Sequence, residues 1–244
     1  MTSKEAALYQ LKNLKGKPFK QKVEHIVTYF STPILIVFLI LSLGISYIVH
    51  LATLKDSALN IVCLNSYANT EETDCYALEF AQSVGINTNE YTVHITTGMI
   101  ISENSPKDSY ETAQAILAQA VAQSIDILAA DLDTLTPYFY QEFFVDLRQI
   151  LSSEQQVYLS KYFLYMDLAY LDQLHNTIDV IPEYPDPTKP EEMSQPVPVG
   201  LLLPLDSSFT HLCYNMLDTQ PSVGIIVNSK NLDNTLSFIN YIMD

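Results

Sequence analysis

Glycine is scarce in this chain, which has only six glycines among its 244 residues. Loops that cradle phosphates and turns that bind dinucleotides need clustered glycines, because the backbone must approach the ligand closely. The sequence has no such cluster, no His-x-x-x-His pair and no Gly-x-Ser-x-Gly turn. It therefore predicts no enzyme, no cofactor and no metal site.

Charged side chains are absent from Thr32 to Ala52, a run of 21 residues rich in Ile, Leu, Val and Phe. As a helix, this run would be about 31 Å long, which matches the hydrocarbon core of a bilayer. Residues 32–54 are therefore predicted to form a transmembrane helix. A cleaved signal peptide is the main alternative, but the run exceeds a typical signal core and ends without a small-residue cleavage site.

Basic residues are few, and half of them lie at one end. Residues 1–31 carry six lysines against two acids, whereas residues 55–244 carry six lysines and arginines against 26 acids. Because basic segments beside a span stay in the cytoplasm, we expect a cytoplasmic tail at 1–31, an uncleaved signal anchor and an extracytoplasmic domain at 55–244. The lysines would also favour contact with an anionic lipid bilayer. The acidic domain argues against nucleic acid as a partner, and the lack of Asn-x-Ser/Thr acceptors favours a bacterial surface.

The three cysteines, Cys63, Cys75 and Cys213, all lie in the predicted extracytoplasmic part. A disulfide is permitted there, and an odd number leaves at least one thiol unpaired. Cys63 belongs to a strand-like run, and Cys75 shares the apolar face of the next helix with Leu78 and Ala81. These two are the candidate disulfide. The alternative is that the cysteines stay free and pack as small hydrophobes.

Short apolar runs alternate with helical patterns after the span. Strands are predicted at 59–64, 91–97, 125–130, 197–203 and 223–227, and helices at 70–84, 110–124, 154–163 and 231–243. Asn69 and Ser152 or Ser153 are predicted helix caps, and Gly85 a helix end. This order predicts an α/β fold with a mixed, mainly parallel sheet flanked by helices. Six prolines at 182–198 predict an extended surface loop.

Two segments resemble a known family. SIDILAADLDTLTPYFYQEFFVDLRQIL (Ser124 to Leu151) and VGIIVNSKNLDNTLSFINYIM (Val223 to Met243) resemble parts of type 2 extracellular solute-binding proteins. With its basic tail and single span, the chain also looks like a group of membrane proteins from Gram-positive bacteria. The resemblance implies a trimmed α/β scaffold, since residues 55–244 are too few for two full lobes. It implies fold more than ligand.

Polar residues gather at the predicted strand ends, where open parallel sheets bind ligands. The candidate ligand-binding residues are Asn65, Tyr67, Asp131, Asp133, Ser207 and Asn228. Asp131 and Asp133 are expected to be exposed loop acids that meet a solute, with Tyr67 as a stacking surface, and an amine or cation suits the acidic field. The alternative is that Asp133 and Ser207 cap helices and that Asn65 and Asn228 are turn residues.

These expectations favour a single-pass, membrane-anchored extracytoplasmic binding or interaction module with a solute-binding-protein-like scaffold. Its partners would be the lipid bilayer, a small-molecule or cationic ligand and a membrane protein. One alternative is a structural or assembly partner of a cell-envelope membrane complex. The second is an extracytoplasmic hydrolase whose catalytic residues form no recognised motif.

Overall fold

The computed structural model describes residues 18–53, 55–102, 104–176, 183–215 and 220–243. In the first helix the side chains of residues 22, 25–27, 29, 30, 33 and 50–53 are also outside the description. Most of the predicted cytoplasmic tail, residues 1–17, lies outside the described residues. The chain divides into two units, Met1–Leu54 and Lys55–Asp244.

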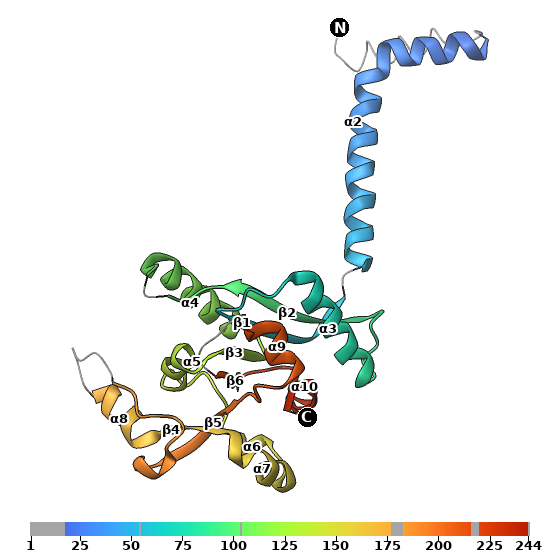
Figure 1. The fold of residues 1–244 in the computed structure, drawn as a ribbon. Coiled ribbons are helices and arrows are strands. Elements are labelled where there is room, and N and C mark those ends of the chain that lie inside the picture. The colour runs from blue at the N-terminus through green and yellow to red at the C-terminus, as the bar shows by residue number, and fades with distance from the viewer. Residues whose placement is uncertain (1–17, 54, 103, 177–182, 216–219, 244) are drawn as a thin grey trace. The chain divides into compact units, whose positions relative to one another are not determined.

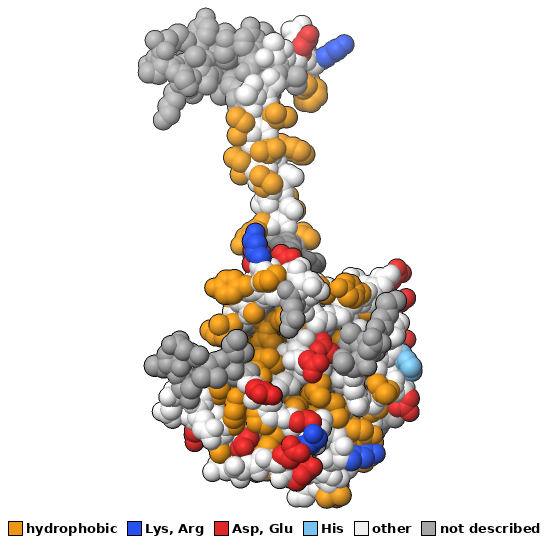
Figure 2. Space-filling model, turned by 60° about the vertical axis from the view of Figure 1, so that its left-hand side comes forward, with side chains coloured by type: hydrophobic (Ala, Val, Ile, Leu, Met, Phe, Trp, Pro, Cys, Tyr) orange, Lys and Arg blue, Asp and Glu red, His pale blue; other side chains and the backbone are white. Residues whose placement is uncertain are grey.

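The first unit contains one long helix, α2 (Phe19–Thr53). Its side chains from Ile34 to Val49 are exposed, and most of them are apolar (Figure 2). Among the residues whose placement is described, no helix combines the length and apolar character needed to cross a membrane.

The second unit is built on one six-stranded sheet (Figure 1). Its strands, in the spatial order β2-β1-β3-β6-β5-β4, are β2 (Tyr91–Met99), β1 (Asp56–Leu64), β3 (Ile127–Asp131), β6 (Pro221–Ile225), β5 (Pro196–Leu202) and β4 (Phe163–Asp167). The strands β2, β1 and β3 run parallel, whereas β6, β5 and β4 are each antiparallel to the preceding neighbour. The α/β class with a mixed sheet is confirmed. The expectation that the sheet is mainly parallel was wrong, because only two of its five strand pairs are parallel.

Helices cover both faces of the sheet. They are α3 (Thr70–Ser83), α4 (Pro106–Val121), α5 (Leu132–Phe139), α6 (Leu147–Ile150), α7 (Ser153–Leu159), α8 (Leu168–Asn176), α9 (Ser208–Tyr214) and α10 (Leu232–Met243), with 3-10 turns at Ser160–Tyr162 and Pro190–Glu192. One core joins alternate β1 residues such as Ile61 to Phe80 of α3, Phe209 of α9 and Phe238 of α10. The other joins Val62 to α4 and α5. Because both faces of β1 are buried, its sequence is a continuous apolar run.

Local signals placed several helix ends correctly. Asn69 caps α3 by accepting a hydrogen bond from the Glu71 backbone N–H, and Ser152 and Gln155 form a capping box at α7. Gly85, with φ of 77°, follows α3 in the left-handed conformation that glycine adopts readily.

Other predictions for this unit were wrong. Strand β4 and helix α8 were not predicted. The helix predicted at 154–163 ends earlier, at Leu159, and β4 begins at Phe163. The predicted proline-rich loop ends three residues early, because β5 begins at Pro196. The apolar face of α3 was misplaced, since the buried helix residues include Tyr76, Ala77 and Phe80 whereas Cys75 is exposed.

Candidate functional site

Asn65 and Asp131 meet where β1 and β3 end. These strands are neighbours in the sheet, and the Asn65 Nδ2 atom donates to Asp131 Oδ2 at 2.9 Å and to Thr134 Oγ1 at 3.0 Å. The Asn65 Oδ1 atom accepts from the Ile101 backbone N–H at 2.8 Å. Asn65 has a φ of 55°, a left-handed conformation that asparagine tolerates. The predicted meeting is confirmed, but the Asn65 amide is occupied in holding three loops together.

Asp131 is a structural cap. It is the N-cap of α5, its Oδ1 accepts from the Thr134 backbone N–H at 2.9 Å, and only 9% of the residue is exposed. The expectation that Asp131 is an exposed loop acid was wrong, because both of its oxygens face protein donors. Asp133, the predicted alternative cap, lies instead in the first turn of α5 and is exposed. It lines a separate pocket of about 440 Å³ with Tyr184 and Asp186.

Ser207 and Asn228 do not join this network. Ser207 is the N-cap of α9, where its hydroxyl accepts from the Thr210 backbone N–H at 3.2 Å. Asn228 follows β6, which is antiparallel to β3, so it lies at the opposite edge of the sheet. There its Nδ2 donates to the Ala120 carbonyl at 2.9 Å. Asn228 does follow a strand, as predicted, but the antiparallel direction of β6 places it away from Asp131.

A pocket opens beside the end of β1. Its volume is about 340 Å³, and its walls are the loop after β1, the start of α3 and the end of α9. The residues that line it are Asn65, Tyr67, Ala68, Asn69, Glu72, Leu212, Cys213, Tyr214 and Asn215. Tyr67 is 77% exposed at this wall. Two predicted residues, Asn65 and Tyr67, therefore line a concave surface, whereas Asp131 does not.

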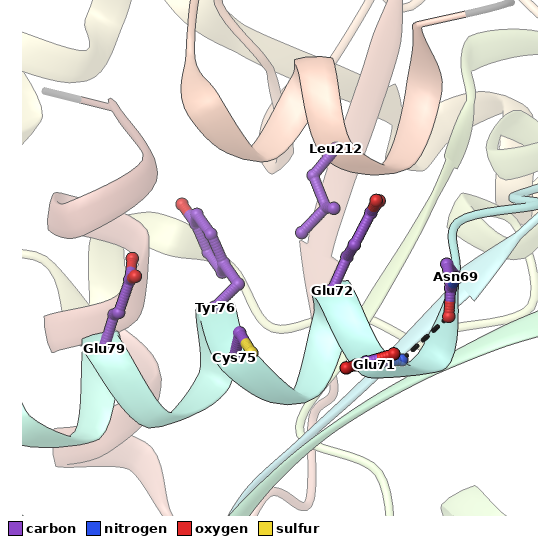
Figure 3. A pocket seen from close by; sticks show the side chains of 7 residues that line it. All are labelled: Asn69, Glu71, Glu72, Cys75, Tyr76, Glu79 and Leu212. Carbon is purple, nitrogen blue, oxygen red and sulfur yellow. Dashed lines mark hydrogen bonds between the residues drawn. The ribbon is translucent and has the colours of Figure 1, made fainter.

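A second pocket of about 490 Å³ adjoins the first, because Asn69, Glu72 and Leu212 line both. Its other lining residues are Glu71, Cys75, Tyr76 and Glu79. Figure 3 shows Glu72, Tyr76 and Glu79 rising from α3 towards α9, and Leu212 reaching down from α9. We call the two adjoining pockets the α3–α9 groove.

Tyr76 forms the fixed base of this groove. Its hydroxyl lies 3.1 Å from Ser208 Oγ, and its ring packs against Phe209 and Tyr241 with centroid separations of 5.9 and 5.7 Å. Burial raises the pKa of Tyr76 to about 12, although the Ser208 hydrogen bond lowers it. The phenol is therefore neutral at physiological pH. It ties α3 to the N-terminal turn of α9, which sets the separation of the groove walls.

The charge of the groove is of one sign. Glu71, Glu72 and Glu79 are exposed along it, and no lysine, arginine or histidine is among its described lining residues. The three carboxylates and the exposed Tyr67 ring can hold an ammonium group, and the side chain of Leu212 can contact an apolar stem. In the described part of the chain, the groove included, no group of three His, Cys, Asp or Glu residues is placed to hold a metal ion.

Sequence reasoning missed the α3 side of the groove. Glu72, Tyr76 and Glu79 have the i, i+4, i+7 spacing of one helix face, so the sequence did contain this signal. The contribution of Leu212 depends on how α9 packs beside α3, and no local pattern encodes that packing.

The cysteines are also arranged differently from the prediction. All three are free thiols, and Cys75 is exposed on α3 whereas Cys63 and Cys213 are buried. Burial, with the Cys213 side chain nearby, raises the pKa of the Cys63 thiol well above its ordinary value. The predicted partner, Cys75, instead lines the groove.

No family model, curated protein or solved structure matches this chain.

Proposed function

We propose that this protein is a membrane-anchored extracytoplasmic binding module whose α3–α9 groove takes a small cationic or amine-bearing solute. The observation that carries the proposal is the groove itself. It sets three exposed glutamates beside the exposed Tyr67 and the apolar Leu212, and none of its described lining residues is basic.

The sequence supports the membrane anchor. The uncharged run from Thr32 to Ala52 continues three residues past Val49, the last described side chain of α2, and six lysines precede it. The described part, from Ile34 to Val49, exposes apolar side chains along the helix. A long helix of this kind needs an apolar environment, which a bilayer supplies. The lysine bias then favours an outward-facing second unit.

The order of strands and helices supports a solute-binding-like scaffold. A sheet with helices on both faces and a pocket where parallel strands end is the arrangement in which α/β proteins bind ligands. The chain is short for a two-lobed transporter component. We therefore propose a single-lobed descendant that binds a solute without transporting it.

The exposure of the glutamates limits the affinity. An exposed ion pair contributes about 0.2–1 kcal/mol, so three such contacts and some apolar burial give a Kd of roughly millimolar order. A polyamine such as spermidine, which carries several ammonium groups, is the best first probe. Binding should weaken at high ionic strength because salt screens exposed charges.

The test is a thermal-shift measurement on the full chain in detergent, with spermidine, putrescine and choline as probes and acetate at equal ionic strength as the anion control. At ten times its Kd a ligand adds about 1.4 kcal/mol, and for this size the Tm rises by about 3–6 °C. Glu72→Gln should weaken the response at least several-fold. Glu154→Gln is the matched control, because Glu154 is also an exposed first-turn glutamate, on α7. A response to acetate equal to that of the cations, or an equal loss of response in both variants, would contradict the groove.

A second candidate function is assembly with another envelope protein. Tyr110, Leu117 and Val121 lie at spacings that share one face of α4, and all three are exposed. An exposed apolar face of this kind is typical of a protein contact. Leu117→Asp should then abolish co-purification of a membrane partner while leaving the response to spermidine unchanged. A chain that purifies alone before and after this change would remove the candidate.

A further inference from the structure

Cys63 and Cys213 lie far apart in the sequence but belong to the same core. Cys63 is the penultimate residue of β1 and is 0% exposed, while Cys213 lies in the last turn of α9 and is 4% exposed. Both side chains point into the core that joins β1 to α3, α9 and α10. A disulfide requires neighbouring cysteines, because the two Cα atoms must lie within about 7 Å. Of the other two cysteines, Cys213 shares the core of Cys63, whereas Cys75 is exposed.

The backbone around this pair is fixed by a second contact. Three residues after Cys63, the Ser66 hydroxyl donates to the Cys213 carbonyl at 2.8 Å, and Ser66 is fully buried. The end of β1 and the last turn of α9 are therefore held together independently of the sulfur atoms. Both thiols are buried in the core that these two segments share.

Once the domain is folded, the two thiols are protected from oxidation. Burial, with the adjacent Cys213, raises the pKa of the Cys63 thiol well above its ordinary value, and attack on a disulfide requires the thiolate. Oxidation is therefore slow in the folded protein and must occur while the domain folds. Cys75, exposed on α3, stays accessible in both states.

We propose that Cys63 and Cys213 form the structural disulfide of this protein and that Cys75 remains its single free thiol. The inference rests on the proposed extracytoplasmic placement, where an oxidant is present. The oxidant is a disulfide, either that of a thiol oxidase or a low-molecular-weight one. One cysteine thiolate attacks it and releases one thiol, and the second cysteine thiolate then displaces the other. Two cysteine S–H bonds are lost, one S–S bond forms, and the oxidant leaves as two thiols.

The bond would act on the proposed binding groove. Leu212, Cys213, Tyr214 and Asn215 form one of its walls, and a link from Cys213 to β1 would hold that wall to the sheet. The link closes a loop of about 150 residues, and disulfides across long loops restrict the unfolded chain strongly. We expect the oxidised protein to have a Tm about 5–15 °C above that of the reduced protein.

The pairing is tested on the purified full chain. The protein is unfolded in reductant, refolded in detergent with oxidised glutathione, alkylated without reduction, digested and analysed by mass spectrometry. The expected result is a linked peptide pair containing Cys63 and Cys213, with alkylated Cys75. The Cys75→Ala variant should form the same link. A Cys63–Cys75 or Cys75–Cys213 link, or three alkylated cysteines, would overturn the assignment.

A second sample separates the pairing from the proposed location. Cells that express the full chain are quenched in acid and alkylated before lysis. A Cys63–Cys213 link in this sample supports both the disulfide and the extracytoplasmic placement. If the link forms during refolding but the cellular protein has three alkylated cysteines, the placement is wrong and the pairing stands. Variants that fold poorly do not affect this test, because it uses the unmodified sequence.

Discussion

Replacement of Asp131 by alanine should destabilise the second unit, whereas the same change at Asp133 should not. The two aspartates are two residues apart at the start of α5. Asp131 is buried and is the N-cap, while Asp133 is exposed in the first turn. The pair therefore separates a structural carboxylate from a surface one within the same local sequence.

The magnitude follows from the two hydrogen bonds of Asp131. Loss of an N-cap costs about 1 kcal/mol, within a range of roughly 0.5–2. Loss of the acceptor for the Asn65 amide, 2.9 Å away, costs about 1 kcal/mol more, because Asn65 keeps only Thr134 as a side-chain acceptor. The sum is about 1.5–3 kcal/mol, which for a domain of this size lowers Tm by about 3–12 °C.

Asp131→Asn is a useful intermediate. Its carbonyl oxygen can still accept from the Thr134 backbone N–H, but its amide group then faces the Asn65 Nδ2 donor. We expect about half the effect of Asp131→Ala, since the cap remains and one hydrogen bond is lost.

The assay is urea unfolding of the full chain in detergent, followed by near-ultraviolet circular dichroism of the tyrosines, since the chain has no tryptophan. Asp133→Ala should change the free energy of unfolding by no more than about 0.5 kcal/mol. Equal effects of the two alanine variants, or an Asp131→Ala effect below about 0.5 kcal/mol, would refute the reasoning.

Two further predictions concern stability. Gly224→Ala should destabilise the domain by about 1–3 kcal/mol, because the added Cβ would lie 2.4 Å from ring atoms of Phe144, and urea unfolding measures this loss. A Gly224→Ala variant as stable as the wild type would contradict this prediction and show that the Phe144 ring moves aside freely. Asp167 should make the domain sensitive to acid: its burial opposes ionisation, but hydrogen bonds from the backbone N–H groups of Ser194 and Gln195, with others from α8, outweigh that cost and lower its pKa. The ionised Asp167 stabilises the fold fully above the unfolded pKa of about 3.9, and this stabilisation is lost as the pH falls through the lower folded pKa. Asp167→Asn should therefore flatten the decline of Tm below about pH 4. An unchanged slope of Tm against pH would contradict this prediction.

Predictions from local signals succeeded where a few neighbouring residues determine the structure. The apolar run that contains Cys63 is a strand because both faces of β1 are buried, and Asn69 caps α3 because its side chain reaches a nearby backbone N–H. The meeting of Asn65 with Asp131 followed from the usual adjacency of strands in α/β sheets.

The failures have a common physical cause, because strand direction and helix packing are decided by distant parts of the chain. Nothing in the sequence around Gly224 shows that β6 runs antiparallel to β3, and this direction places Asn228 away from Asp131. Strand β4 is only five residues long, and its edge position is fixed by pairing with β5. The packing of α9 decides that Cys213 shares a core with Cys63 and that Leu212 lies beside α3.

The extracytoplasmic placement of residues 55–244 underlies both the groove and the disulfide proposals, and native Cys75 provides a direct test of it. Intact cells expressing the full chain are treated with a membrane-impermeant maleimide, which should label the exposed Cys75 without permeabilisation. Cys75→Ala should lose the label. A cysteine introduced in the tail of that variant by Ser3→Cys should be labelled only after permeabilisation. Labelling of the tail cysteine in intact cells, with Cys75 protected until the membrane is opened, would contradict the account.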